Sequence, residues 1–165
     1  MQFRKLKHKN GLLWLVFCLV VVVAIEHYGG DGGGSPQQTY QSGFLEMLDV
    51  EGHAIENHVA KTDDYLSKRL RNEDISAAST FNDYTEAEIA IRNVLLDRGS
   101  LVNKWLNAEK SNKKAFYTLF NKPIGRVLKR GWDTPRSGNQ ARVVLVRDAD
   151  YDTGFFILTA YPEYR

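Results

Sequence analysis

The stretch RVVLVRDADYDTGFFILTAY, residues 142–161, contains two apolar runs on either side of a turn-rich segment. The runs at 142–148 and 155–161 are rich in the β-branched and aromatic residues that favour strands. Between them, the segment DADYDTG supplies the Asp and Gly residues that favour turns. The stretch therefore predicts two antiparallel strands joined as a hairpin.

The second of these strands is expected to have two chemically different faces. Successive side chains of a strand point to opposite sides of the sheet, so Thr159 and Tyr161 place two hydroxyls on one face, about 7 Å apart. The side chains expected on the other face, against the helices, are Phe156, Leu158 and Ala160. Paired hydroxyls on a strand, with a histidine and an arginine from helices, would suit a site that handles phosphate.

The residues before this hairpin predict helices followed by two further strands. Thr62 can cap a helix, and a capping box from Thr85 to Glu88 begins another helix that ends at Gly99. Alternating runs at 115–120 and 125–131 then predict strands. Helices first and antiparallel strands last indicate an α+β fold, in which N-terminal helices pack on a C-terminal antiparallel sheet.

Residues 1–28 are expected to form a hydrophobic signal or anchor segment that is separate from the fold. Basic residues precede an uninterrupted apolar run of 14 residues, 12–25. A membrane-spanning helix needs about 20 residues, and the apolar part of an export signal about 7–15. We therefore expect export or a single inner-membrane anchor at residues 12–25, with a purely cytosolic protein as the alternative.

Residues 29–43 are rich in Gly, Ser and Gln and predict a flexible linker, so the folded domain is expected to span 44–165. Cys18 is the single cysteine of the chain, so no intramolecular disulfide and no cysteine-based metal site are possible. No Asp, Glu and His cluster has the spacing of metal ligands, and we predict neither a metal nor a cofactor. The net charge of +2 permits a polyanionic partner without requiring one.

Two histidines, His53 and His58, lie in the segment GHAIENHVAKTDDYLSKRL, residues 52–70. Histidine is the side chain whose ordinary pKa lies nearest neutral pH, so acid–base chemistry at that pH often uses it. Either residue could instead be an ordinary structural or surface histidine. The segment by itself leaves both possibilities open.

Five segments of the chain stand in an order and spacing that point to one family. They are GHAIENHVAKTDDYLSKRL (52–70), ISAASTFNDYTEAEIAI (75–91), KPIGRVLKRG (122–131), RVVLVRD (142–148) and FFILTAYP (155–162). Together they resemble the bacterial RNase A-like toxin domain at the C-terminus of contact-dependent growth-inhibition (CdiA) proteins. The resemblance covers roughly residues 50–165 and excludes the apolar N-terminus and the linker.

The resemblance implies an RNase A-like fold without disulfides, and metal-independent cleavage of RNA that leaves a 2′,3′-cyclic phosphate. The family's site consists of a histidine, an arginine eleven residues later, and the threonine and tyrosine of the last strand. The matching residues of this chain are His58, Arg69, Thr159 and Tyr161. The residue eleven positions after His53 is Asp64, so the resemblance selects His58.

Each of these residue types has a role in the implied mechanism. A neutral His58 accepts the proton of the attacking 2′-hydroxyl. Arg69 donates a fork of hydrogen bonds to the phosphate oxygens as negative charge builds on them. Thr159 and Tyr161 donate to the same phosphate, and Tyr161 is also a candidate to assist the leaving oxygen, although an ordinary phenol has a pKa of about 10.

A basic stretch and two tryptophans are further candidates for contact with RNA. The basic residues are Lys122, Arg126, Lys129 and Arg130, which either follow the RNA backbone or protect an edge strand with charge. Trp132 is a candidate for stacking on a base, whereas Trp105 is expected in the core.

These features predict a ribonuclease toxin of interbacterial competition, with RNA as its substrate and a cognate immunity protein as its partner. We expect a monomer whose toxin domain acts in the cytosol of a target cell, and which stays on the membrane through residues 12–25 if that segment is not cleaved. The alternative is a catalytically silent, envelope-associated domain that uses the same fold to bind a partner.

Overall fold

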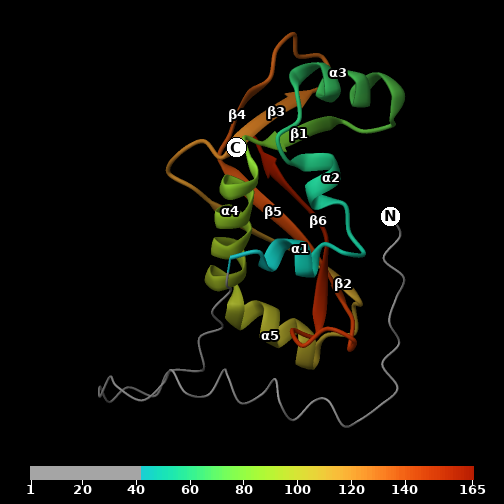
Figure 1. Cartoon of the computed structure of the whole chain (residues 1–165), viewed down its shortest axis with the longest axis vertical. Helices are drawn as coiled ribbons and strands as arrows, with labels where there is room; N and C mark the ends of the chain where they lie inside the picture. Colours follow the sequence, from blue (N-terminus) through green and yellow to red (C-terminus); the bar gives the residue numbers. More distant parts are fainter. Residues whose placement is uncertain (1–41) are drawn as a thin grey trace. The chain divides into compact units, whose positions relative to one another are not determined.

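The computed structural model describes residues 42–165, and these residues form helices and strands in a mixed order (Figure 1). The helices are α1 (Phe44–Leu48), α2 (Ala54–His58), α3 (Asp63–Asn72), α4 (Tyr84–Asp97) and α5 (Gly99–Ala108). The strands are β1 (Ala77–Phe81), β2 (Lys113–Leu119), β3 (Gly125–Lys129), β4 (Arg136–Gly138), β5 (Gln140–Arg147) and β6 (Phe155–Glu163). The expectations for residues 1–28 and for the linker up to residue 41 lie outside the described residues. Between residues 42 and 165, no helix has the length and apolar character needed to cross a membrane.

The strands form two antiparallel sheets, with the orders β1-β3-β4 and β2-β5-β6. The predicted hairpin is confirmed as β5 and β6. β6 also contacts β1 and β3, so it runs from one sheet to the other (Figure 1). The α+β prediction is confirmed, with two differences: the strands form two sheets instead of one, and β1 lies between α3 and α4 instead of after the helices.

The two sheets approach each other closely at Gly125, the first residue of β3. A Cβ atom at this position would lie 2.2 Å from the carbonyl oxygen of Thr80 and 2.7 Å from Cγ of Pro162 near the end of β6. Only glycine lets β3 pass between these groups without a clash. The end of β6 is therefore held against the first sheet.

The helix starts follow local capping chemistry. Thr62 caps α3 as predicted, because its hydroxyl accepts a hydrogen bond from the backbone N–H of Tyr65 at 3.2 Å. The predicted capping box at Thr85 is wrong. The cap is Asp83, whose carboxylate accepts from the backbone N–H of Glu86 at 2.7 Å, so α4 begins at Tyr84. A carboxylate at the N-terminus of a helix also interacts favourably with the helix dipole.

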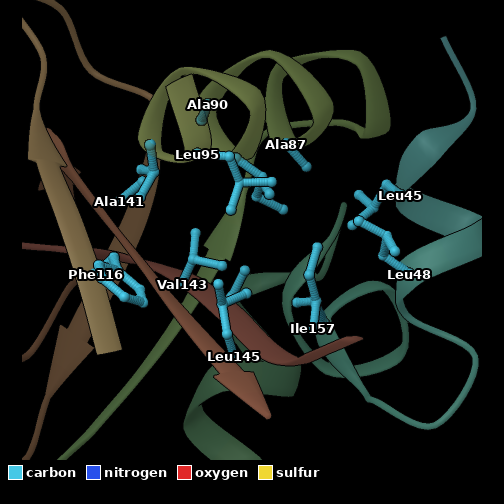
Figure 2. Close-up of a cluster of buried hydrophobic side chains, with 14 of the residues drawn as sticks. Leu45, Leu48, Ala87, Ala90, Leu95, Phe116, Ala141, Val143, Leu145 and Ile157 are labelled. Carbon is cyan, nitrogen blue, oxygen red and sulfur yellow. The ribbon is translucent and has the colours of Figure 1, made fainter. Parts of the chain in front are cut away.

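The main core lies between α4 and the β2-β5-β6 sheet, and α1 closes one edge of it (Figure 2). Fully buried side chains at its centre are Ile91, Val94, Val143, Leu145 and Ile157. Trp105 of α5 is fully buried, as expected, and its indole N–H donates to the carbonyl oxygen of Ser111 at 2.8 Å. A smaller apolar cluster of Leu66, Leu70, Ala78 and Leu128 holds α3 on β1 and β3.

A bulge at Leu158 interrupts the pairing of β6 with β5. Thr159 lies opposite Val144, whereas Ile157 lies opposite Leu145. The single step from Val144 to Leu145 on β5 therefore corresponds to two steps on β6, and Leu158 is the extra residue. A bulge of this kind exchanges the faces that the following residues present.

The bulge overturns part of the predicted pattern of β6. The side chains fully buried in the core are Phe155, Ile157 and Ala160, and the expectation that Phe156 and Leu158 face the helices is wrong. Beyond the bulge, Thr159 and Tyr161 alternate with the buried Ala160 and share the opposite face, as predicted. The first half of the strand therefore builds the core, and the second half also contributes to a cleft.

Candidate active site

A cleft of about 700 Å³ is lined by residues of α2, α3, β1, β3 and β6, together with the two C-terminal residues. The four residues that the resemblance assigned to catalysis all line it: His58, Arg69, Thr159 and Tyr161. The fold thus brings together side chains that come from both ends of the domain.

His58 is the last residue of α2 and is only 8% exposed. Its Nδ1 lies 2.9 Å from the backbone carbonyl oxygen of Ser79 in β1. Because a carbonyl oxygen only accepts, Nδ1 of the neutral ring carries the proton, and Nε2 keeps its lone pair. Burial lowers the pKa of His58 from 6.5 to about 4, and the positive charge of Arg69 acts in the same direction. At neutral pH His58 is therefore an uncharged ring that can accept a proton.

The short helix α2 is fixed at its start by Asp49. The two carboxylate oxygens of Asp49 accept hydrogen bonds from the backbone N–H groups of Ala54 and Ile55, both at 2.9 Å. Burial raises the pKa of Asp49, although these two hydrogen bonds oppose the rise. The first N–H groups of a helix have no carbonyl partner within the helix, and in α2 the Asp49 carboxylate accepts their hydrogen bonds instead.

The loop before α2 docks directly on the bulge of β6. The backbone N–H of His53 donates to the carbonyl oxygen of Leu158, the bulged residue, at 3.1 Å. A Cβ atom at Gly52 would lie 2.1 Å from the carbonyl oxygen of Ile157, so the contact requires glycine. These contacts hold α2 against the strand that carries the two hydroxyls, and they fix His58 relative to that strand.

Arg69 forms a two-point ion pair with Glu73, one turn later in the chain. Nε donates to one carboxylate oxygen at 2.8 Å and Nη2 to the other at 2.7 Å. The remaining nitrogen, Nη1, is buried and has no hydrogen-bond partner among residues 42–165. Glu73 thus occupies the Nε–Nη2 edge of the guanidinium, and the donors that remain for an anion are the two N–H groups of Nη1 and the second N–H of Nη2.

Thr159 and Tyr161 belong to the wall of the cleft that also contains His58. Oγ1 of Thr159 is buried and, like Nη1 of Arg69, lacks a partner in the part of the chain that the structure describes. The ring centroids of Tyr161 and His58 are 5.3 Å apart. Burial raises the pKa of Tyr161, with the charge of Arg142 opposing the rise, so the phenol keeps its proton and serves as a donor.

The four basic candidates for RNA contact occupy different environments. Lys129 lines the cleft. The other three do not line it and are engaged elsewhere: Arg126 with Asp63 at 2.9 Å, Lys122 with Glu86 at 3.1 Å, and Arg130 with the carbonyl oxygens of Glu73 and Ile75 at 3.0 and 2.9 Å. RNA binding by these three residues stays a prediction without support from the geometry.

Several cleft residues were not assigned to the site from the sequence. His53, which the resemblance did not select, also lines the cleft, with its ring centroid 6.5 Å from that of His58. Glu73 lies four residues after Arg69 on a predicted helix, a spacing that could have identified the ion pair. Tyr164 also lines the cleft, and no motif in the surrounding sequence marks it.

The carboxylates near the cleft do not form a metal centre. Asp74 and Glu163 line the cleft, and Glu163 pairs with Arg142 at 2.9 Å. In the described range, no group of three or more His, Cys, Asp and Glu residues is placed to hold a metal ion. The cleft therefore offers hydrogen-bond donors to an anion and one neutral proton acceptor, His58.

The geometry is that of a small α+β domain with a cleft suited to an anionic ligand. Residues 52–162 match the family described as the bacterial CdiA-CT RNAse A domain, and the chain belongs to that family. It is also similar to a chain in the crystal structure of a CdiA-CT/CdiI complex from Y. kristensenii 33638, with 30% identity, a TM-score of 0.65, and coverage of 68% of this chain and 99% of that chain. No similar protein was found among curated proteins. Membership implies a ribonuclease of the toxin type used in contact-dependent inhibition.

Proposed function

We propose that the domain at residues 44–165 is a metal-independent endoribonuclease toxin that cleaves RNA through attack of the 2′-hydroxyl on the adjacent phosphorus. The product carries a 2′,3′-cyclic phosphate. One observation supports this proposal most directly. His58 is buried and neutral, its Nδ1 proton is engaged with Ser79, so that Nε2 keeps its lone pair, and it lines the same cleft as Arg69, Thr159 and Tyr161.

The reaction begins with transfer of the 2′-hydroxyl proton to Nε2 of His58. The oxygen released in this way attacks the phosphorus, and the ring becomes an imidazolium cation. Burial disfavours that cation, so His58 alone is a weak base. The negative charge of the bound phosphate raises the pKa of His58 in the complex, because it stabilises the imidazolium. The substrate therefore helps to activate the base that attacks it.

Negative charge then builds on the non-bridging phosphate oxygens as the new bond from O2′ to phosphorus forms. Nη1 of Arg69 and Oγ1 of Thr159 are buried donors without partners among the described residues, a condition that costs free energy. Both residues line the cleft, so a phosphate bound there could accept from these donors once the side chains shift to expose them. Removing one donor to a developing oxyanion typically lowers a reaction rate about 10²–10³-fold.

Tyr161 is proposed to complete the reaction as the bond between phosphorus and the 5′-oxygen breaks. The phenol retains its proton because burial raises its pKa, and an alkoxide leaving group is a strong enough base to take it. A transfer through water from the imidazolium of His58 to the phenolate of Tyr161 then restores both residues. The 5.3 Å separation of the two ring centroids is compatible with such a relay.

A cleavage assay in the presence of EDTA tests the proposal. The domain should degrade single-stranded RNA and leave DNA of the same sequence intact, because the attack needs a 2′-hydroxyl and no metal. Activity that disappears with EDTA and returns with Mg²⁺ would contradict a metal-independent mechanism. A folded domain that binds RNA without cutting it would favour the catalytically silent domain instead.

The remaining parts of the proposal concern partners and delivery. The similar solved chain comes from a CdiA-CT/CdiI complex, and we propose that this chain likewise binds a cognate immunity protein. The toxin domain would act in the cytosol of a target cell. Residues 12–25 would direct export or anchor the chain in the inner membrane, as their apolar composition suggests.

A further inference from the structure

Two aromatic rings and two cations that the proposed reaction does not use gather around Tyr164, on the wall of the cleft. Tyr164 and Lys129 line the cleft. Trp132 meets Tyr164 edge to face, with ring centroids 5.1 Å apart and an interplanar angle of 85°. Arg136 lies over Trp132, with Cζ 4.2 Å from the ring centroid. Lys129, Trp132, Arg136 and Tyr164 are called the aromatic–cation cluster below.

The Tyr164 ring is held in place by its neighbours. Trp132, which contacts it, packs against the small apolar cluster that contains Leu66 and Leu128. The next residue, Arg165, donates from Nε to the side-chain oxygen of Gln140 at 2.7 Å. Tyr164 is nevertheless 39% exposed. A fixed ring with an accessible surface, on the wall of a cleft, loses little entropy when a flat ligand stacks on it.

The two cations of the cluster keep their charge available. Nζ of Lys129 lies 5.5 Å from the Tyr164 centroid, and Cζ of Arg136 lies 5.9 Å from it. Neither cation forms a salt bridge with a carboxylate among residues 42–165, in contrast to Arg126 and Lys122. The cluster therefore combines an aromatic surface with two cations that form no salt bridge among the described residues.

We propose that the aromatic–cation cluster is a nucleotide-binding subsite: Tyr164 stacks on a base next to the cleaved phosphodiester, and Lys129 and Arg136 bind a neighbouring phosphate. This inference rests on the proposed function. Stacking on an aromatic ring suits any base, and backbone phosphates attract cations whatever the sequence. Tyr164 is the ring that receives the base, because it lines the cleft whereas Trp132 does not, and because Arg136 lies closer to Trp132 than either cation lies to Tyr164.

Three variants of the full-length chain test the subsite. Tyr164→Ala removes the ring, whereas Tyr164→Phe keeps the ring and removes the hydroxyl. Tyr117→Ala is the matched control, because Tyr117 is 52% exposed and also lies near two arginines, with Cζ of Arg98 at 5.8 Å and Cζ of Arg142 at 6.0 Å, but does not line the cleft. Each variant is measured for cleavage of an RNA oligomer and for affinity to a 2′-O-methyl RNA oligomer, which cannot be cleaved.

The subsite predicts that Tyr164→Ala weakens binding of the 2′-O-methyl oligomer about tenfold, since loss of one stacked base typically has an effect of this order. Tyr164→Phe and Tyr117→Ala should bind as the unmodified chain does. An oligomer with an abasic nucleotide at one position flanking the cleaved bond should bind equally well to the unmodified chain and to Tyr164→Ala.

Unchanged binding and cleavage by Tyr164→Ala would overturn the subsite and leave the proposed ribonuclease intact. An unmodified chain that binds RNA without cleaving it would refute the proposed function. The comparison of RNA affinity between the unmodified chain and Tyr164→Ala would still decide whether Tyr164 binds a base. If Tyr164→Ala keeps its RNA affinity and loses only affinity for an immunity protein, the cluster is a protein-docking surface and the subsite is overturned.

Discussion

The main core and the cleft share strand β6, but the core buries apolar side chains whereas the cleft buries polar atoms without hydrogen-bond partners among residues 42–165. On the core side, Phe155, Ile157 and Ala160 are fully buried among other apolar side chains. On the cleft side, buried polar atoms of Arg69 and Thr159 have no partner in the described part of the chain. Apolar burial stabilises a fold, whereas an unpaired buried donor opposes it.

The difference shows how stability and chemistry are separated within one strand. The bulge at Leu158 lets β6 fill the core on one side and present Thr159 and Tyr161 on the other. It also supplies the carbonyl oxygen that holds the loop before α2, and thereby positions His58. Substitutions on the core side should therefore change stability, and substitutions on the cleft side should change activity.

The largest effect is expected at His58. His58→Ala removes the proton acceptor and should lower kcat/KM for RNA cleavage by about 10²–10⁴-fold, the usual contribution of a general base. His53→Ala is the control in the same cleft and should keep most of the activity. Thermal midpoints of both variants establish that they fold. An inactive, folded His53→Ala together with a fully active His58→Ala would mean that His53 is the base.

The next effect lies on the core side of β6. Ile157→Ala deletes a fully buried side chain and should lower the free energy of unfolding by about 2–5 kcal/mol, as measured by urea denaturation. The folded fraction of this variant should cleave RNA at the original rate, because the side chain faces away from the cleft. A large loss of activity without loss of stability would show that the two faces are not separate.

Thr159→Val tests the unpaired hydroxyl of the cleft. The variant should lose about 10²-fold in kcat, the effect of removing one donor to a developing oxyanion, with little change in the thermal midpoint. Thr118→Val is a matched control, since Oγ1 of Thr118 on β2 is likewise buried and unpaired within residues 42–165. Equal activity losses in the two variants would refute a specific role for Thr159.

The last prediction concerns pH. The pKa of about 4 for His58 predicts that kcat/KM changes little between pH 7 and 5 and falls only near pH 4, where the free enzyme takes up the proton. An unfolded chain binds this proton from pH 6.5 downward, so the free energy of unfolding should decrease as the pH falls from 6.5 to 4. An acid limb of kcat/KM centred near 6.5 would show that His58 is not a buried base.

Much of the fold could be predicted from local patterns. The alternating runs identified β5 and β6, and Thr62 marked the start of α3. The bulge at Leu158 could not be predicted, because the carbonyl it frees is bound by His53, about a hundred residues earlier in the chain. For the same reason β1 was missed: its pairing with β3 depends on contacts that are distant in sequence.

Some residues of the candidate site could be predicted from the sequence and others could not. The resemblance supplied His58, Arg69, Thr159 and Tyr161, and the fold brings them to one cleft. The ion pair of Arg69 with Glu73 is a short-range helical pair that the sequence could have revealed. The position of Tyr164 beside Trp132 depends on how the end of β6 packs on the first sheet, and no local pattern encodes that packing.

Analysis of the cleavage product tests the central claim most directly. An RNA oligomer is digested in EDTA, and the new ends are identified by mass spectrometry and ³¹P NMR. Attack by the 2′-hydroxyl predicts a 2′,3′-cyclic phosphate on one fragment and a 5′-hydroxyl on the other. It also predicts that a single 2′-deoxynucleotide on the 5′ side of the cleaved bond prevents cleavage at that bond. A 5′-phosphate product, or cleavage of the 2′-deoxy oligomer at that bond, would contradict the mechanism.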